Sequence, residues 1–193
     1  MRVVAGSSRG LRIEAPPGSS TRPTSDRVRE SMFNALASID AIDGTRVLDL
    51  FAGSGALAIE ALSRGADTAT LVESDRAART TIEANLTRAR VADRASLVAG
   101  DARAFLARAP VPFDLVLLDP PYRFDGWPGL LDALLPRLAD DAVVVIEADQ
   151  SVTVPPPLAV VREKRYGSTV VTFARMPSSP HPSSPALPAG DHE

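Results

Sequence analysis

The chain has 193 residues, 45% of them hydrophobic, and a formal net charge of −3, which together indicate one domain with a full hydrophobic core. It contains no cysteine, so disulfides, thiolate metal sites and a cysteine nucleophile are excluded, and both histidines, His181 and His192, lie close to the carboxyl end. No run of about eighteen apolar residues occurs and no signal-peptide pattern follows Met1, so we expect a cytoplasmic protein without a membrane span.

The first 30 residues are basic although the whole chain is acidic: they hold six arginines against three acids. Residues 2–5 and 11–14 flank a Gly-Ser-Ser-Arg-Gly turn, which predicts a small hairpin, and residues 15–20 form a Pro/Gly/Ser loop. We predict that residues 1–24 form an extension that contacts nucleic-acid phosphates. The arginines assigned to this contact are Arg9, Arg12, Arg22, Arg27 and Arg29.

A helix is predicted from Ser25 to Ile39, where it opens a main domain that we place at residues 25–175. Its apolar residues recur with helical spacing and are Val28, Met32, Ala35, Leu36 and Ile39. Arg27 and Arg29 fall outside this apolar stripe and are expected to point away from the sheet.

An apolar strand ending near Leu50 leads into a loop that contains Gly53 and Gly55 and then into a helical pattern. Glycine permits positive φ and a close approach of ligand to backbone, so this loop predicts a binding site. The spacing also fits a dinucleotide fingerprint, which makes a nicotinamide-dependent oxidoreductase one alternative. Asp49 opposes that alternative, because its charge would repel a pyrophosphate and attract the ammonium group of S-adenosylmethionine.

Four predicted parallel strands each end at an acid: Asp49, Glu73, Asp101 and Asp119. Glu73 lies 20 residues after Gly53, where it can accept hydrogen bonds from ribose hydroxyls of either cofactor. Asp101 fits a helix N-cap as well as it fits recognition of an adenine amine. The predicted cofactor-binding residues are Asp49, Phe51, Ala52, Gly53, Ser54, Gly55, Glu73, Asp75, Asp101, Ala102 and Asp119.

The predicted catalytic residues are Asp119, Pro120, Pro121 and Tyr122, which follow the apolar strand of residues 113–118. The carboxylate and the Pro120 carbonyl can accept hydrogen bonds from one NH2 group, and the tyrosine ring can stack on a flat base. Two prolines make this segment rigid, because each fixes φ near −65°. The pattern therefore predicts a clamp for an amine-bearing ring.

Beyond the strands and helices that alternate up to Glu147, three consecutive prolines at 155–157 interrupt the pattern. Residues 158–165 and 168–175 predict an antiparallel hairpin around Tyr166-Gly167. Residues 176–193 hold five prolines, four serines and no core-forming pattern, so we predict a disordered tail.

The clamp and the glycine loop resemble the motifs of class I S-adenosylmethionine-dependent amino-methyltransferases. A narrower resemblance starts at Arg22-Pro23-Thr24-x-Asp26-Arg27-Val28-Arg29-Glu30 and continues through the glycine loop and Glu60-Ala61-Leu62-Ser63-Arg64. From about residue 2 to 175 the chain resembles the bacterial 16S rRNA guanine-N2 methyltransferases known as RsmD. This implies a Rossmann-like class I methyltransferase fold of the α/β class, doubly wound around a mostly parallel sheet with an antiparallel terminal strand, plus a small N-terminal hairpin.

The resemblance further implies methylation of a guanine N2 amine in 16S rRNA, guanine 966 in standard numbering, within the assembling or assembled 30S subunit. We expect a monomer that needs no metal and no membrane. One alternative is an adenine-N6 DNA methyltransferase, although the chain has no room for the usual target-recognition domain. The other is a catalytically silent module that binds S-adenosylmethionine or RNA.

Overall fold

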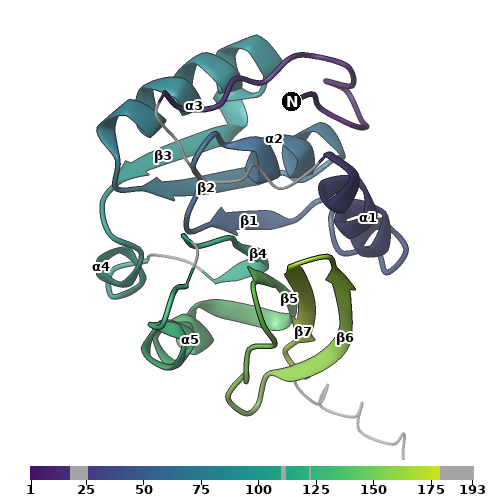
Figure 1. The fold of residues 1–193 in the computed structure, drawn as a ribbon, viewed down its shortest axis with the longest axis vertical. Coiled ribbons are helices and arrows are strands. Elements are labelled where there is room, and N and C mark those ends of the chain that lie inside the picture. Colours follow the sequence, from purple (N-terminus) through teal and green to yellow (C-terminus); the bar gives the residue numbers. More distant parts are fainter. Residues whose placement is uncertain (18–25, 110–111, 122, 179–193) are drawn as a thin grey trace, which may run out of the picture.

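Seven strands form a single sheet in the computed structural model, which describes residues 1–17, 26–109, 112–121 and 123–178 (Figure 1). The strand order is β3-β2-β1-β4-β5-β7-β6. Neighbours among the first five strands are parallel, while β7 is antiparallel to both β5 and β6. The strands are β1 (Arg46–Asp49), β2 (Thr68–Glu73), β3 (Ala95–Ala99), β4 (Phe113–Leu118), β5 (Leu138–Ala148), β6 (Ala159–Tyr166) and β7 (Thr169–Arg175). The predicted Rossmann-like architecture and its antiparallel final pair are confirmed.

Helices cover both faces of this sheet. The described helices are α1 (Asp26–Ala37), α2 (Ala56–Ser63), α3 (Arg76–Ala89), α4 (Ala102–Leu106) and α5 (Trp127–Leu134), with short 3-10 turns η1 (Ala92–Arg94) and η2 (Leu135–Arg137). Residues of α1, α2 and α3 share one buried cluster, and residues of α4 and α5 share another. Among the described residues, none of the helices combines the length and the apolar composition that a membrane crossing requires.

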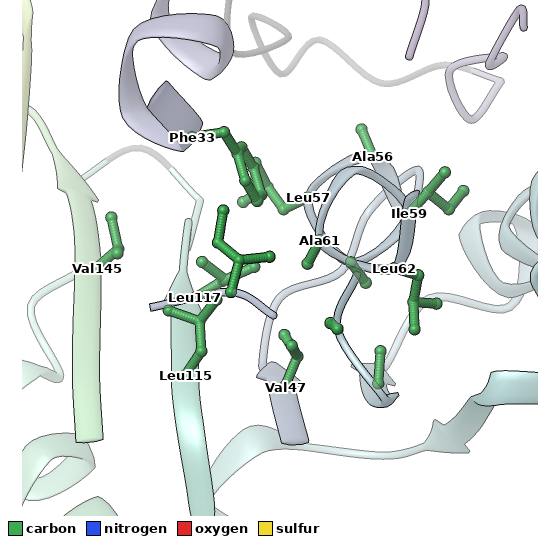
Figure 2. Close-up of a cluster of buried hydrophobic side chains, with 14 of the residues drawn as sticks. Phe33, Val47, Ala56, Leu57, Ile59, Ala61, Leu62, Leu115, Leu117 and Val145 are labelled. Atoms are coloured by element: carbon green, nitrogen blue, oxygen red, sulfur yellow. The ribbon is translucent and has the colours of Figure 1, made fainter. Parts of the chain in front are cut away.

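Strand β4 is apolar at almost every position because it is covered on both faces. Leu115 and Leu117 belong to the cluster with α1 and α2, where Figure 2 shows them near Phe33 and Leu57. The β4 side chains that point to the opposite face, Val116 among them, pack in the cluster with α4 and α5. The alternation of side chains along a strand therefore fills both layers from one short run.

Helix α1 ends two residues earlier than predicted. Val28, Met32 and Leu36 are buried as the apolar spacing indicated, but Ile39 lies beyond the helix and is 41% exposed. The Ala41 amide donates to the Leu36 carbonyl and Asp40 adopts a φ of 52°, which is a left-handed C-terminal turn. The chain turns there, so Ile39 cannot continue the apolar stripe.

Residues 1–17 pack against the helix layer formed by α1, α2 and α3. The small N-terminal hairpin is confirmed: the Val3 amide donates to the Leu11 carbonyl at 3.0 Å, that of Gly10 to Val3 at 2.9 Å and that of Ile13 to Met1 at 3.0 Å, around one antiparallel bridge between Arg2 and Arg12. Val3 and Ile13 are 2% exposed and join the core beneath these helices. The described part of the predicted extension therefore shares the core of the main domain, and the boundary at residue 24 stays a prediction.

The end of the described chain is attached to the sheet. The Met176 amide donates to the Ala142 carbonyl at 2.9 Å, and the Ser178 hydroxyl bonds to the Asp141 carboxylate at 3.1 Å. Backbone pairing therefore continues one residue past β7, to Met176, while the disordered tail from residue 176 stays a prediction. Residues 179–193 lie outside the described part of the chain.

Two glycines of the N-terminal segment allow a stability test. Gly6 and Gly10 both have φ of +82°, but a Cβ at Gly6 would lie 1.7 Å from the Ser63 carbonyl oxygen, whereas nothing lies within 4 Å at Gly10. We expect Gly6→Ala to lower the free energy of unfolding by roughly 2–4 kcal/mol, and Gly10→Ala by about 1 kcal/mol from backbone strain alone. Urea unfolding followed by circular dichroism measures both. Equal losses would contradict the close docking of this segment on α2.

Candidate active site

The parallel register brings three of the predicted acids together at the carboxyl edge of the sheet. Asp49 ends β1 and pairs in register with Leu71 of β2 and Leu117 of β4. Two residues further along the chain, Glu73 ends β2 and Asp119 directly follows β4. The charges of both raise the pKa of Asp49, which places the three carboxyl groups close to one another. Such a site favours a positively charged ligand.

Asp49 is fully buried beneath the start of α2. One carboxylate oxygen accepts a hydrogen bond from the Ala58 amide at 3.3 Å, and the other, Oδ1, has no hydrogen-bond partner among the described residues. The pKa of Asp49 is raised to about 7, mainly by burial and in addition by the neighbouring charges of Asp119 and Glu73. The amides of Ala58 and Phe51 act in the opposite direction. An unpaired buried carboxylate oxygen calls for a donor from a ligand.

Glu73 holds the glycine loop in place. Its carboxylate accepts hydrogen bonds from the Gly53 amide at 2.9 Å and from the Asp75 amide at 2.8 Å. Gly53 and Gly55 have φ of 54° and 76°, and a Cβ at Gly55 would lie 3.3 Å from Leu71 Cδ2. Glycine at 55 is therefore required both by the backbone conformation and by close packing against β2.

The acids at 75 and 101 serve as helix caps. Asp75 accepts from the Ala78 amide at the start of α3, and Asp101 Oδ1 accepts from the Arg103 and Ala104 amides at the start of α4. The N-cap interpretation of Asp101 is thus confirmed as a structural role. Asp101 also lines a pocket, so its position suits a ligand contact as well.

This pocket, of about 270 Å³, lies between the ends of β1 and β3, α4 and the segment that follows β4. Its lining comprises Phe51, Asp101, Ala102, Arg103, Phe124, Asp125, Gly126 and Leu130. Three of these residues, Phe51, Asp101 and Ala102, were predicted from the sequence. The aromatic rings of Phe51 and Phe124 beside the carboxylates of Asp101 and Asp125 suit a flat polar ring.

Residues that follow the clamp also line the pocket, and none of them was predicted from the sequence. The Phe124 ring packs edge-on against Phe51 at 5.5 Å between centroids and against Trp127 at 5.1 Å. Arg103 donates to the Gly126 carbonyl at 2.8 Å and so ties α4 to this segment. Phe124 and Trp127, two aromatic residues that closely follow the clamp in the sequence, were the pattern from which this part of the pocket could have been predicted.

The clamp residues begin directly after β4. Asp119 and Pro120 are half-buried, and Pro121 is exposed. Tyr122 lies outside the described residues. The catalytic assignment of all four residues stays a prediction, with the Asp119 carboxyl close enough to Asp49 to affect its pKa.

Among the predicted RNA-contacting arginines, Arg29 requires a correction. It is 1% exposed, it donates to the Arg2 carbonyl and to Asp26, and its Nε lies 3.9 Å from Glu60 Oε2. A guanidinium enclosed in this way holds the N-terminal segment against α2 and is not available to phosphates. Arg9, Arg12 and Arg27 are exposed, whereas Arg22 lies outside the described residues.

Comparisons with known proteins give a consistent family. Residues 1–175 match the family model described as conserved hypothetical protein 95. The chain is 40% identical to ribosomal RNA small subunit methyltransferase D of Escherichia coli K12 over 176 residues, which cover 86% of this chain and 85% of the relative. The Haemophilus influenzae protein of the same name is 31% identical over 174 residues, covering 86% and 89%.

A solved structure described as "Putative methyltransferase yhhF from Escherichia coli" superimposes with a TM-score of 0.82 at 38% identity, covering 93% of this chain and 99% of that one. The similarity therefore spans the sheet, the glycine loop and the clamp together.

The raised pKa of Asp49 leads to a stability test. In the unfolded chain this carboxyl ionises near pH 4, whereas in the folded chain it ionises near pH 7, so its contribution to stability is present below pH 4 and lost as the pH rises to 7. Relative to Asp49→Asn, the parent should lose about 1.4 kcal/mol of unfolding free energy per pH unit in this window. Urea unfolding of both proteins at pH 5, 6, 7 and 8 measures the difference. A difference independent of pH would contradict the raised pKa.

Proposed function

This chain belongs to the family of the ribosomal RNA small subunit methyltransferase D proteins, and we propose that it methylates 16S rRNA with S-adenosylmethionine as methyl donor. The acceptor in this proposal is the exocyclic N2 amine of a guanine, guanine 966 in standard numbering. The observation that carries it is the placement of Asp49 and Asp119 at the ends of the paired strands β1 and β4. A cofactor loop and an amine clamp thereby adjoin each other.

The residues at the sheet edge fit S-adenosylmethionine. The unpaired oxygen of Asp49 offers an acceptor to the ammonium group, and Glu73 offers carboxylate oxygens to the ribose. The pocket beside Phe51, Asp101 and Ala102 suits adenine. When bound, this cofactor supplies a methyl group on a sulfonium, which leaves as a neutral thioether.

The chain's own contribution to transfer is to orient the acceptor amine. The lone pair of a guanine N2 is delocalised into the ring, so the amine is a poor nucleophile until its geometry becomes more tetrahedral. Hydrogen bonds from its N–H groups to the Asp119 carboxylate and the Pro120 carbonyl favour that geometry and fix the direction of attack. Tyr122 stacks on the extruded base, and the proton leaves to Asp119 or to water.

Exposed arginines support an RNA substrate. Arg9 and Arg12 lie on the outer side of the N-terminal segment, and Arg27 lies in the first turn of α1. These charges face solvent on a protein whose net charge is −3, which concentrates phosphate attraction on one region. We extend the proposal to the 30S subunit, during or after assembly, as substrate, and to a monomeric cytoplasmic enzyme that uses no metal.

The proposed function predicts a specific product. Incubation with labelled S-adenosylmethionine and 30S particles from a strain that lacks this activity should give N2-methylguanine after nuclease digestion and mass spectrometry. The position is read from digested 16S rRNA fragments. Label found as N6-methyladenine in DNA, with none in ribosomal RNA, would overturn the substrate assignment.

The clamp predicts a separation of catalysis from cofactor binding. Asp119→Ala should lower turnover by roughly 10²-fold or more, because its hydrogen bond acts mainly in the transition state. Its affinity for S-adenosylmethionine, measured by isothermal titration, should change much less. The exposed carboxylate of Asp132 on α5 provides the matched control, Asp132→Ala, which should match the parent. If Asp119→Ala turned over at the parent rate, the clamp would have a structural role and its catalytic assignment would be wrong.

A further inference from the structure

A second pocket lies on the opposite face of the sheet from the pocket beside Phe51 and Asp101 that is proposed to bind adenine. It is an open depression with a volume of about 390 Å³, lined by the outer side of α1 and by Arg162 of β6. On α1 its lining includes Arg27, Ser31, Asn34 and Ser38. We call it the α1–β6 pocket. Hydroxyl, amide and guanidinium groups dominate its walls, a composition that suits a polar, anionic ligand.

A bulge in β6 determines which charges face this pocket. Val160 pairs with Ala174 and Arg162 pairs with Phe173, so Val161 is an extra residue in the strand. After the bulge, Arg162, Lys164 and Tyr166 share the face toward α1, because the Tyr166 hydroxyl bonds to Ser31.

The acid of this strand faces the other way. Glu163 accepts hydrogen bonds from Ser151 at 2.8 Å and from Thr172 at 3.1 Å on the far face. Lys164 lies above the Tyr166 ring, with its Nζ 4.8 Å from the centroid. The face of β6 toward α1 is therefore basic, while the carboxylate of Glu163 is hydrogen-bonded on the opposite face.

The cations around the α1–β6 pocket form no ion pair within 4.0 Å inside the described ranges, although Glu30 lines the same pocket. Arg27, Arg162 and Lys164 are exposed and none forms an ion pair with another described residue. Glu30 is the one acid among the lining residues. Charged residues on an edge strand also discourage pairing with other sheets, but that role does not require them to face a polar pocket beside Arg27.

The end of β6 and the start of α1, which flank the pocket, lie near the active-site edge. Strand β6 is parallel to β5, since both are antiparallel to β7, so its Tyr166 end lies at the same edge as the end of β4 (Figure 1). Helix α1 begins near that edge as well: Arg29 contacts Met1, whose sulfur lies 3.8 Å from the Ser54 hydroxyl of the glycine loop. A strand of RNA that enters the clamp can therefore continue across β6.

We propose that the α1–β6 pocket binds the sugar-phosphate backbone of the RNA next to the methylated nucleotide. Arg162 and Arg27 contact phosphates, Lys164 adds attraction along the path, and the polar side chains of α1 lie beside ribose. This inference rests on the proposed function and adds a second contact region to the exposed arginines of the N-terminal segment.

The test compares Arg162→Glu with a control of equal charge change on the other face of the sheet. Arg108, exposed near the end of α4, provides it as Arg108→Glu. Methylation rates are measured over a range of concentrations of undermethylated 30S particles, and separately of naked 16S rRNA, at several KCl concentrations. Melting temperatures and S-adenosylmethionine titration confirm that each variant folds and binds cofactor.

For Arg162→Glu we expect KM for RNA to rise roughly tenfold or more with kcat within about twofold, because a charged hydrogen bond outside the reacting centre is lost. The slope of log KM against log salt should fall by about 0.7–0.9 for the lost phosphate contact. Arg162→Lys should restore most of the affinity, and Arg108→Glu should behave as the parent.

Three outcomes would overturn the inference. The first is a parent-like KM and salt slope for Arg162→Glu. The second is a KM that rises for 30S particles but not for naked rRNA, which would assign the pocket to a ribosomal protein. The third is equal loss in Arg108→Glu, which would indicate a general charge effect. Failure of the proposed function itself is distinguishable, because the parent would then methylate neither substrate.

Discussion

The buried carboxyl group of Asp49 connects the sheet to both halves of the active site. It ends β1, accepts a hydrogen bond from the Ala58 amide in the first turn of α2, and is affected by the charges of Asp119 and Glu73. Burial of a carboxylate near two others is unfavourable, which is why its pKa rises to about 7. In the proposed function, a positively charged ligand bound beside these carboxylates offsets their unfavourable proximity. The neighbouring charges of Asp119 and Glu73, which disfavour the ionised form of Asp49, are also the charges that would attract a sulfonium cofactor.

A second buried carboxylate, Glu60, organises the other side of α2. It is fully buried, accepts the Val4 and Ala5 amides at 2.8 and 3.0 Å, and forms an ion pair with Arg64 at 2.7 Å. Arg29 approaches it from α1. Buried charges persist when they are paired and hydrogen-bonded, and here the pairing attaches the N-terminal segment to the domain. The arginines exposed on that segment are consequently held in a defined position relative to the glycine loop.

The two faces of the sheet have different chemistry around the common edge. The α4 and α5 face presents an aromatic pocket with Phe51 and Phe124, which suits a flat ring. The α1 face presents the basic α1–β6 pocket. In the proposed function, the cofactor and the RNA approach the predicted clamp of Asp119 and Pro120 from these two faces.

The sequence by itself determined the alternation of strands and helices, the acids at the strand ends, the glycine loop and the final hairpin. Each of these depends on local features: the period of the apolar residues, the conformational freedom of Gly55, and the rigidity of Pro120 and Pro121. Only the tertiary structure decided that Arg29 is buried, that Arg103 and Phe124 shape the pocket, and that Arg162 faces α1. These outcomes depend on contacts between distant segments, such as the bond between Ser31 and Tyr166, 135 residues apart. Local patterns cannot encode such contacts, because they arise from strand order and from a one-residue bulge that reverses which side chains face the helix.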